Sequence, residues 1–183
     1  MPAGQDLLAC LRYPLPISMS LLDLIVNRRS IRRYRAERVP QETLERVLEA
    51  GKCAPSADNQ QPWHFVVVTD PEIKEKLSKG RWNRFVRDSA FTVVGCAYAG
   101  DANSRKWSII DTTIALQNMV IAAWSLGIGS CWVGDFEEVE VRRIVNVPEE
   151  WRIVSLISFG YPEETPSATP RKPLKEIASY NRF

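Results

Sequence analysis

The segment from Asp111 to Leu126 constrains the fold most, because it predicts a long helix that is apolar around most of its circumference. Gly127 follows it directly, and glycine is the residue that most often ends a helix. A helix of this pattern is buried on nearly all sides, so it runs through the centre of a domain or lies in a subunit interface. The apolar residues of this region are Ile110, Ile114, Ala115, Leu116, Met119, Val120, Ile121, Ala122, Ala123 and Trp124.

Short segments rich in apolar and β-branched residues predict four strands, and helical patterns precede and separate them. The predicted strands cover residues 63–69, 91–98, 129–134 and 152–162. The other predicted helices cover residues 19–27, 40–51, 71–80 and 135–145. This order predicts an α+β fold of the α/β sandwich type, in which a central mixed sheet of about four strands is flanked by helices.

Local signals refine the connections between these elements. Asp135 and Glu138 form a D-x-x-E pattern that predicts a capping box at the start of the helix that follows them. Residues 99–108 are polar and predict an irregular connection. The proline-rich tail after Pro162 predicts an extended chain, with one short helical turn near residues 174–178.

Length and composition describe an ordinary globular chain of 183 residues, with 24 basic against 22 acidic residues. A net charge of +2 gives no reason to expect nucleic acid or an anionic membrane as the main partner. No apolar run approaches the ~20 residues of a membrane helix. We expect residues 1–18 to be an N-terminal extension without a signal peptide, residues 19–183 to form one domain, and the location to be cytoplasmic.

The four cysteines include no C-x-x-C pair, and the chain contains a single histidine, His64. This argues against a zinc site and favours buried, reduced thiols. His64 lies inside a predicted strand, and we expect it to be packed and hydrogen-bonded rather than catalytic. The chain also lacks the G-x-S-x-G, P-loop and H-E-x-x-H motifs. A cofactor would therefore carry any chemistry, while the protein binds and orients it.

Five of the eight residues from Arg28 to Arg35 are arginines. A solvated basic face is one interpretation. Binding of nucleic acid is a second, although Tyr34 is the only aromatic residue among them. A site for a phosphate-bearing cofactor is the third, because guanidinium groups match phosphate oxygens and Ser30 adds a hydroxyl donor.

Two further stretches are candidates for contact with a cofactor. Residues 55–65, PSADNQQPWHF, concentrate amide groups that are able to pair with the edge of a heterocycle, although a hydrogen-bonded turn would look the same. Residues 127–136, GIGSCWVGDF, contain three glycines that allow a close approach of the backbone. The second stretch is not a G-x-G-x-x-G that opens a helix, so we reject a Rossmann dinucleotide site.

Four stretches taken together resemble the FMN-dependent nitroreductase family, in the family's order and spacing from about residue 19 to residue 183. They are RRSIRRY (28–34), APSADNQQPWHF (54–65), DTTIALQNMVIAAWSLGIGSCWVG (111–134) and the tail that begins PRKPL and ends YNRF (170–183). The resemblance implies a nitroreductase-like fold and a tight homodimer with two FMN sites at its interface. The apolar helix, with Val120 in it, would then pack against its twin across the two-fold axis.

The resemblance also implies a phosphate-binding group of residues. Arg28 would reach the FMN phosphate, and Ser30 and Arg32 would reach the ribityl chain and the pyrimidine side of the ring. A positive charge there would stabilise a reduced, anionic ring. The residues assigned to this group are Arg28, Arg29, Ser30 and Arg32, together with Arg171 from the tail, which would pair with the phosphate and for which Lys172 is the alternative.

A second group of residues would contact the ring. Part of it belongs to a loop that approaches the cofactor from the other subunit, and part to a strand end whose backbone faces the ring. The residues assigned to this group are Pro55, Ser56, Ala57, Val133 and Gly134. Asn59 and Gln60 belong to the same loop motif and either bind the cofactor or only support the loop. The stretch KGRWNRF (79–85) matches the family poorly and receives no role. Trp82, Trp107 and Tyr98 either line a substrate face or pack in the core.

The function implied by the resemblance is transfer of hydride from NADH or NADPH, through FMN, to a nitroaromatic, quinone or similar acceptor in a ping-pong scheme. The alternatives are a flavin-binding or storage protein, a family member with dehalogenase, dehydrogenase or flavin-cleaving chemistry, and a nucleic-acid-binding dimer that uses the arginine cluster.

Overall fold

The computed structural model describes residues 20–183, so the predicted extension 1–18 lies outside the described residues. The α-helices are α1 (Leu21–Asn27), α2 (Gln41–Lys52), α3 (Pro71–Leu77), α4 (Ala102–Ser125) and α5 (Glu138–Val145). The strands are β1 (Trp63–Val68), β2 (Phe91–Tyr98), β3 (Gly129–Val133) and β4 (Trp151–Gly160). Three short 3-10 helices complete the order, namely η2 (Ala57–Asn59), η3 (Arg84–Val86) and η4 (Leu174–Glu176).

The sheet has four strands in the order β1-β2-β4-β3, as the sequence predicts in number. The prediction of a mixed sheet is wrong, because all three neighbouring pairs of strands are antiparallel. Helix α4 does connect two strands of the same direction, β2 and β3, as a crossover helix should. Strand β4 lies between these two and runs in the opposite direction, so no parallel pair of strands forms.

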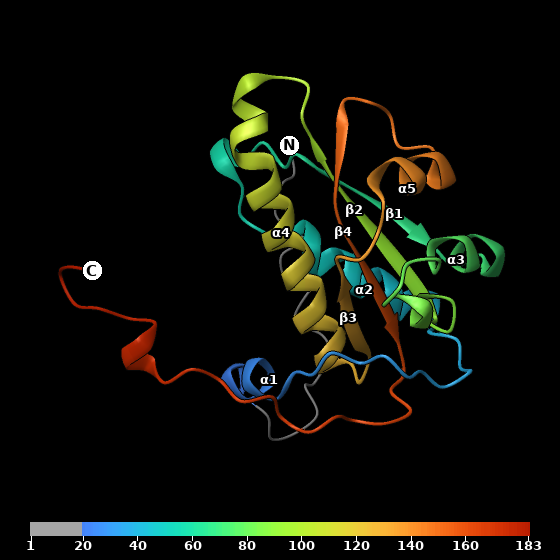
Figure 1. Cartoon of the computed structure of the whole chain (residues 1–183), viewed down its shortest axis with the longest axis horizontal. Coiled ribbons are helices and arrows are strands. Elements are labelled where there is room, and N and C mark those ends of the chain that lie inside the picture. Colours follow the sequence, from blue (N-terminus) through green and yellow to red (C-terminus); the bar gives the residue numbers. More distant parts are fainter. Residues whose placement is uncertain (1–19) are drawn as a thin grey trace, which may run out of the picture.

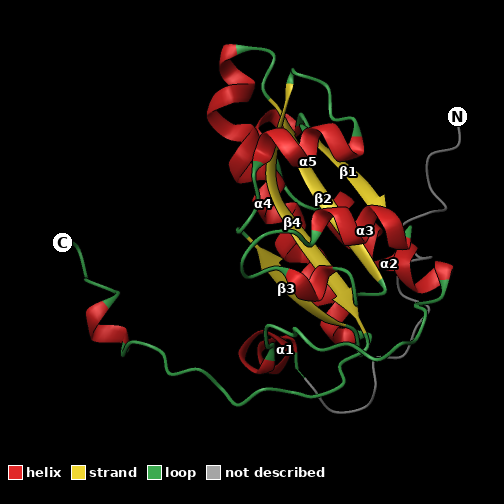
Figure 2. Ribbon diagram, turned by 45° about the vertical axis from the view of Figure 1, so that its right-hand side comes forward, coloured by secondary structure: helices red, strands yellow, loops and turns green. Residues whose placement is uncertain are grey.

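Helices cover both faces of the sheet, which gives three layers (Figures 1 and 2). Helices α2 and α4 pack on one face, in a core that includes Leu44, Val47 and Leu116. Helices α3 and α5 pack on the other face, in a second core that includes Leu77 and Val141. The alternation of strands and helices in the sequence therefore leads to the predicted sandwich.

Helix α4 begins at Ala102, nine residues before the predicted start at Asp111. The polar segment 99–108 was expected to be irregular, but it contains no proline and its one glycine, Gly100, precedes the helix. Nothing in it therefore breaks the helix, and polar residues suit the end of a helix that projects beyond the sheet.

The burial of α4 decides between the two positions that the sequence predicts for it, the centre of a domain and a subunit interface. The helix runs through the centre of one chain, where Val120 is completely buried among core residues of that chain. The placement of Val120 in an interface is therefore wrong. A narrow stripe of α4 remains exposed, and it includes Ile110 at 49% and Ile114 at 36% of their full accessibility.

The predicted capping box of Asp135 and Glu138 does not form. Helix α5 begins at Glu138 with Glu137 as its N-cap, and no side chain caps it. The Asp135 carboxylate instead accepts a hydrogen bond from the backbone N–H of Trp82, which lies more than fifty residues earlier in the chain. The Asp135 carboxylate therefore forms a tertiary contact instead of capping α5.

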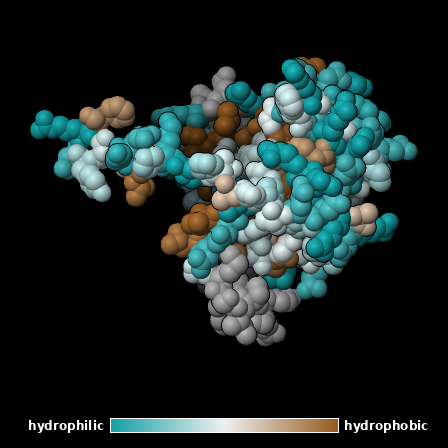
Figure 3. All heavy atoms as spheres, turned by 60° about the horizontal axis from the view of Figure 1, so that its bottom comes forward, coloured by the Kyte–Doolittle hydropathy of each residue, from teal (hydrophilic) through white to brown (hydrophobic). Residues whose placement is uncertain are grey.

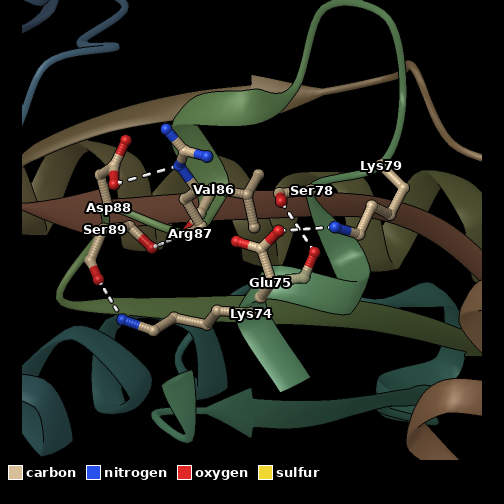
Figure 4. A network of polar contacts seen from close by, with 8 residues as sticks. All are labelled: Lys74, Glu75, Ser78, Lys79, Val86, Arg87, Asp88 and Ser89. Carbon is tan, nitrogen blue, oxygen red and sulfur yellow. Dashed lines mark hydrogen bonds and ion pairs between the residues drawn. The ribbon is translucent and has the colours of Figure 1, made fainter. Parts of the chain in front are cut away.

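Helix α3 is fixed to the turn that precedes β2, as Figure 4 shows. The Lys74 ammonium is buried and donates a hydrogen bond to the carbonyl of Ser89. Burial lowers the pKa of Lys74, while the nearby carboxylates of Asp88 and Asp70 raise it. This contact joins the end of segment 78–89 to α3.

The tail after β4 extends away from the body of the molecule and carries η4, close to the predicted helical turn (Figure 1). It is exposed from residue 163 onward and contains large apolar side chains. More apolar side chains are exposed on α1 and α4, and Figure 3 shows apolar groups on the side of the body from which the tail departs. The exposed apolar residues of these three regions are Leu21, Leu22, Ile25, Val26, Trp107, Ile110, Ile114, Leu174, Ile177, Tyr180 and Phe183.

We expect Tyr34→Phe to lower the free energy of unfolding by about 1–3 kcal/mol, the usual cost of unsatisfied buried polar groups. The buried Tyr34 hydroxyl donates to the Ile31 carbonyl at 2.7 Å and lies 2.8 Å from the Ser158 hydroxyl. Urea unfolding measures the change, and Tyr180→Phe in the exposed tail is the control. Equal stability of the two variants would contradict the prediction.

Candidate functional site

The arginine-rich segment lies along the outer edge of β3. The backbone N–H of Ile31 donates to the Ser130 carbonyl at 2.9 Å, and Ser30 forms a parallel bridge with Ser130. Ile31 is fully buried and packs so closely on Gly129 that a Cβ there would lie 2.5 Å from its side chain. This pairing brings Arg28, Ser30 and Arg32 into one row that runs in the same direction as the strand.

Electrostatics at the start of this row favour an anion. Burial lowers the pKa of Arg28, and the positive charge of Arg171 lowers it further. Within residues 20–183, neither of these arginines forms an ion pair with a carboxylate. Arg28 is half-buried, and its positive charge and that of Arg171 are not neutralised by a carboxylate. A phosphate dianion would supply the missing negative charge.

The other residues of the cluster have different partners. Arg29 donates to the carbonyls of Val26 and Arg28, each at 3.0 Å, and so binds the C-terminal end of α1. Arg33 forms ion pairs with Glu163 at 3.0 Å and Glu164 at 3.5 Å. The cluster is therefore not a uniform basic face: Arg28 and Arg32 are available for a ligand, whereas Arg33 is neutralised.

Lys172, the remaining basic residue of the predicted phosphate group, is exposed next to Arg171 in the extended tail. The tail reaches this position because it leaves β4 alongside the arginine segment. The Arg35 N–H donates to the Tyr161 carbonyl at 2.9 Å, and the Glu163 N–H donates to the Arg33 carbonyl at 3.0 Å. Residues about 130 positions apart in the sequence thus meet at one edge of the sheet.

Cys131 lies beneath this row on β3. Burial raises its pKa, while the Arg32 charge and a hydrogen bond with the Ser30 side chain act in the opposite direction. Burial also raises the pKa of Cys96, to about 11. Both residues are therefore protonated thiols near neutral pH, whereas Cys53 is exposed and Cys10 lies outside the described residues.

The far end of the row is open. Val133 is buried, but Gly134 is exposed, and a Cβ on Gly134 would meet no atom within 4 Å. The packing of this chain does not fill the space beside Gly134, so a flat group is able to approach the backbone there. Arg28, Ser30, Arg32 and Gly134 follow one another along one edge, in the order that a phosphate, a polyol chain and a ring would require.

Residues 79–85, which the sequence left without a role, adjoin this open end. The guanidinium of Arg32 lies 5.9 Å from the centre of the Phe85 ring. Trp82 is joined to Asp135, the residue directly after Gly134. No sequence signal pointed to this contact, because the pattern at Asp135 indicated a helix cap.

The amide-rich loop is strained and lies in another part of the chain. Asp58, Asn59 and Gln61 have φ values of 52°, 53° and 50°, a conformation that side chains other than glycine rarely adopt. The loop is held by two contacts of Ser56 and Ala57. The Ser56 hydroxyl accepts from the Gln61 N–H at 2.9 Å, and the Asp111 carboxylate accepts from the Ala57 N–H at 3.2 Å.

One chain does not bring this loop to the arginine row. Asp111, which holds the loop, lies 14 residues before Ser125 at the end of α4, and this length of helix spans roughly 20 Å. The loop precedes β1, the outer strand on the opposite side of the sheet from β3, and three strand spacings amount to about 14 Å (Figure 1). Five of the predicted site residues therefore lie apart from the arginine row and the end of β3. They are Pro55, Ser56, Ala57, Asn59 and Gln60.

His64 lies on β1, as predicted, but its side chain is exposed rather than packed in the core. Its ring meets the edge of Trp151 at 5.7 Å, far from the β3 edge of the sheet. Among residues 20–183, no group of three His, Cys, Asp or Glu side chains is arranged to hold a metal ion. None of the helices described is long and apolar enough to cross a membrane.

Comparison with known proteins identifies this arrangement. The model of the nitroreductase family matches residues 25–87 and 78–161. A protein of Methanothermobacter thermautotrophicus named as an NADH dehydrogenase/NAD(P)H nitroreductase is 37% identical over 81% of this chain and 80% of its own length. The iodotyrosine deiodinase of Thermotoga neapolitana is 28% identical over 89% of this chain and 98% of its own length.

A solved structure agrees with these sequence matches. An FMN-dependent nitroreductase of Clostridium difficile superposes with a TM-score of 0.79 at 28% identity, over 88% of this chain and 99% of that chain. The match of the family model covers the arginine row, the loop 55–60 and the end of β3. The chain therefore belongs to the nitroreductase family.

Proposed function

We propose that this protein is an FMN-dependent oxidoreductase that takes hydride from NADH or NADPH and reduces a small organic acceptor. The observation that carries the proposal is that the positive charges of Arg28 and Arg171 repel each other while neither has a carboxylate partner among residues 20–183. The names of the relatives support it, since they include an NAD(P)H nitroreductase and an FMN-dependent nitroreductase.

The residues of the row fit the parts of FMN. Arg28 and Arg171 would bind the phosphate, with Lys172 beside them and Arg29 holding the adjacent helix end. Ser30 and Arg32 would lie along the ribityl chain and the pyrimidine edge. The open space at Val133 and Gly134 would receive the ring, whose edge then faces backbone groups rather than an acidic side chain.

FMN supplies the capacity to accept a hydride and release it again. This chain orients the ring, and the charge of Arg32 stabilises negative charge that develops on the pyrimidine side. The site offers no side-chain acid among the assigned residues, so water would deliver the protons. Donor and acceptor would use the same open face in turn, which gives a ping-pong scheme.

The complete site would require two copies of the chain. The strained loop 55–60 is too far from the arginine row of its own chain, so the loop of a second copy would complete the site. The exposed stripe of Ile110 and Ile114 on α4, and the apolar side chains of the extended tail, would be covered in such a homodimer. Each dimer would then hold two sites, one at each arginine row.

Dehalogenation is a second candidate, because one relative is a deiodinase that matches 89% of this chain. Release of iodide from iodotyrosine in the presence of reductant tests it directly. Turnover of nitroaromatic or quinone acceptors without release of iodide would favour the first candidate. A protein that binds flavin but oxidises NAD(P)H with neither class of acceptor would be a flavin storage protein.

The visible absorption spectrum tests the proposal, first on the protein as purified and then after anaerobic addition of NADH or NADPH. We expect a bound flavin spectrum that bleaches with one of the two reductants. A spectrum that does not bleach would exclude NAD(P)H as the electron donor. A colourless protein that also fails to bind added FMN would overturn the proposal.

We expect Arg28→Ala to weaken the binding of FMN by about 10- to 100-fold, because a charge-assisted hydrogen bond contributes roughly 1.5–3 kcal/mol. Equilibrium dialysis against FMN measures the dissociation constant. Arg33→Ala is the matched control, since Arg33 belongs to the same cluster but is paired with Glu163 and Glu164. Equal dissociation constants for the wild type and Arg28→Ala would remove Arg28 from the phosphate site.

We expect Ile114→Asp to abolish the dimer and to release flavin, because a charge would replace an apolar side chain in the exposed stripe of α4. Analytical sedimentation with detection of flavin absorbance measures both effects. Val139→Asp is the control, since Val139 is 75% exposed on α5, on the other side of the sheet. An Ile114→Asp protein that remains a flavin-loaded dimer would place the interface elsewhere.

A further inference from the structure

Trp82 combines two properties that rarely occur together, because its indole is exposed while its backbone is firmly held. Its side chain is 69% exposed, which leaves a large apolar ring in solvent. A mobile loop tip would explain such exposure without any function. The contacts of residues 80–85, however, describe an anchored turn.

Three contacts join the turn 80–85 to Asp135, the residue that follows Gly134 at the end of β3. The Trp82 N–H donates to the Asp135 carboxylate. The Asn83 side chain is 1% exposed, and its amide donates to the carbonyls of Leu77 at 3.0 Å and Asp135 at 2.9 Å. A Cβ on Gly80 would lie 2.6 Å from the Asp135 carbonyl, so the close approach of the two segments requires glycine.

These contacts place the backbone of Trp82 beside the open end of the proposed cofactor site. Asp135 follows Gly134, the residue whose backbone faces the space left by this chain. Phe85, at the other end of the turn, packs under the guanidinium of Arg32. The turn therefore spans from Arg32 to Gly134, which are the two positions assigned to the ring of the cofactor. The chain that follows this turn is joined to α3 by the hydrogen bond from Lys74 to Ser89 (Figure 4).

Arg81 adds charge to this surface. Its guanidinium lies over the indole of Trp82, 4.9 Å from the ring centre. Such a contact supports one face of the indole and leaves the other face for a planar ligand. Within residues 20–183, Arg81 forms no ion pair with a carboxylate, so its charge is available to an anionic group at the edge of that ligand.

We propose that Trp82 forms an aromatic wall of the acceptor site and that, together with Arg81, it selects planar aromatic acceptors with a negatively charged substituent. The inference rests on the proposed function and specifies its substrate class. For para-nitrobenzoate, the hydride of NAD(P)H and one proton from water convert the nitro group to a nitroso group, and one oxygen leaves as water. NAD(P)⁺ is the oxidised product.

The test compares steady-state kinetics of the flavin-loaded wild type, Trp82→Ala and Trp82→Phe with para-nitrobenzoate as the acceptor. We expect kcat/KM to fall about tenfold in Trp82→Ala, mainly through KM, and to recover largely in Trp82→Phe, as loss and return of ring stacking would produce. Reoxidation of the reduced protein by dioxygen, which is neither planar nor aromatic, should be unchanged. An equal loss with both acceptors, or no loss with para-nitrobenzoate, would overturn the role of Trp82.

The charge of Arg81 is tested with a matched pair of acceptors, para-nitrobenzoate and the cationic para-nitrobenzylamine. We expect Arg81→Gln to reduce the preference for the anionic acceptor about tenfold. Arg84→Gln removes an exposed charge from the same turn and should leave the preference unchanged. An unaltered preference in Arg81→Gln would refute the role of Arg81 in selecting anionic acceptors. A wild-type protein without flavin would instead contradict the proposed function itself.

Discussion

The pairing of residues 28–32 with the outer edge of β3 is the interaction on which the site depends. A single backbone hydrogen bond, from Ile31 to Ser130, sets the register, and burial of the Ile31 side chain against Gly129 holds it. Because an extended segment alternates its side chains, burial of Ile31 turns Ser30 and Arg32 away from the core. The same pairing protects an outer strand that would otherwise expose its backbone groups.

In the proposed function, the arginine row is a site that its own chain leaves incomplete. Burial and the positive charge of Arg171 both disfavour the charged form of Arg28. A bound anion would offset both effects. The loop 55–60 also carries an energetic cost, because its residues with positive φ are strained. The contacts of Ser56 and Asp111 hold the loop in this conformation. In a homodimer these two incomplete surfaces would be brought together, which explains how so small a chain could enclose a cofactor of this size.

The turn 80–85 extends the same edge toward the proposed position of the acceptor. In a chain without a long insertion over the site, a turn of six residues is a short means of placing an aromatic side chain beside the ring. Its position depends on Asp135 and Asn83, two polar residues that serve as structural anchors rather than as chemical groups. The selectivity proposed for Trp82 therefore depends on hydrogen bonds between segments more than fifty residues apart.

The sequence by itself determined the strands, the central helix and the family, because periodicity and short motifs are local properties. It predicted β2 with its observed bounds. The assignment of Arg28, Ser30 and Arg32 to FMN stays a prediction, and the structure adds that the three residues lie along the edge of β3. The direction of the strands, the complete burial of Val120, the capture of Asp135 by Trp82 and the separation of loop 55–60 from the arginines were decided only by the tertiary structure. Each of these depends on which distant segment packs against which, and the free energy of such packing is not encoded in any single stretch of the chain.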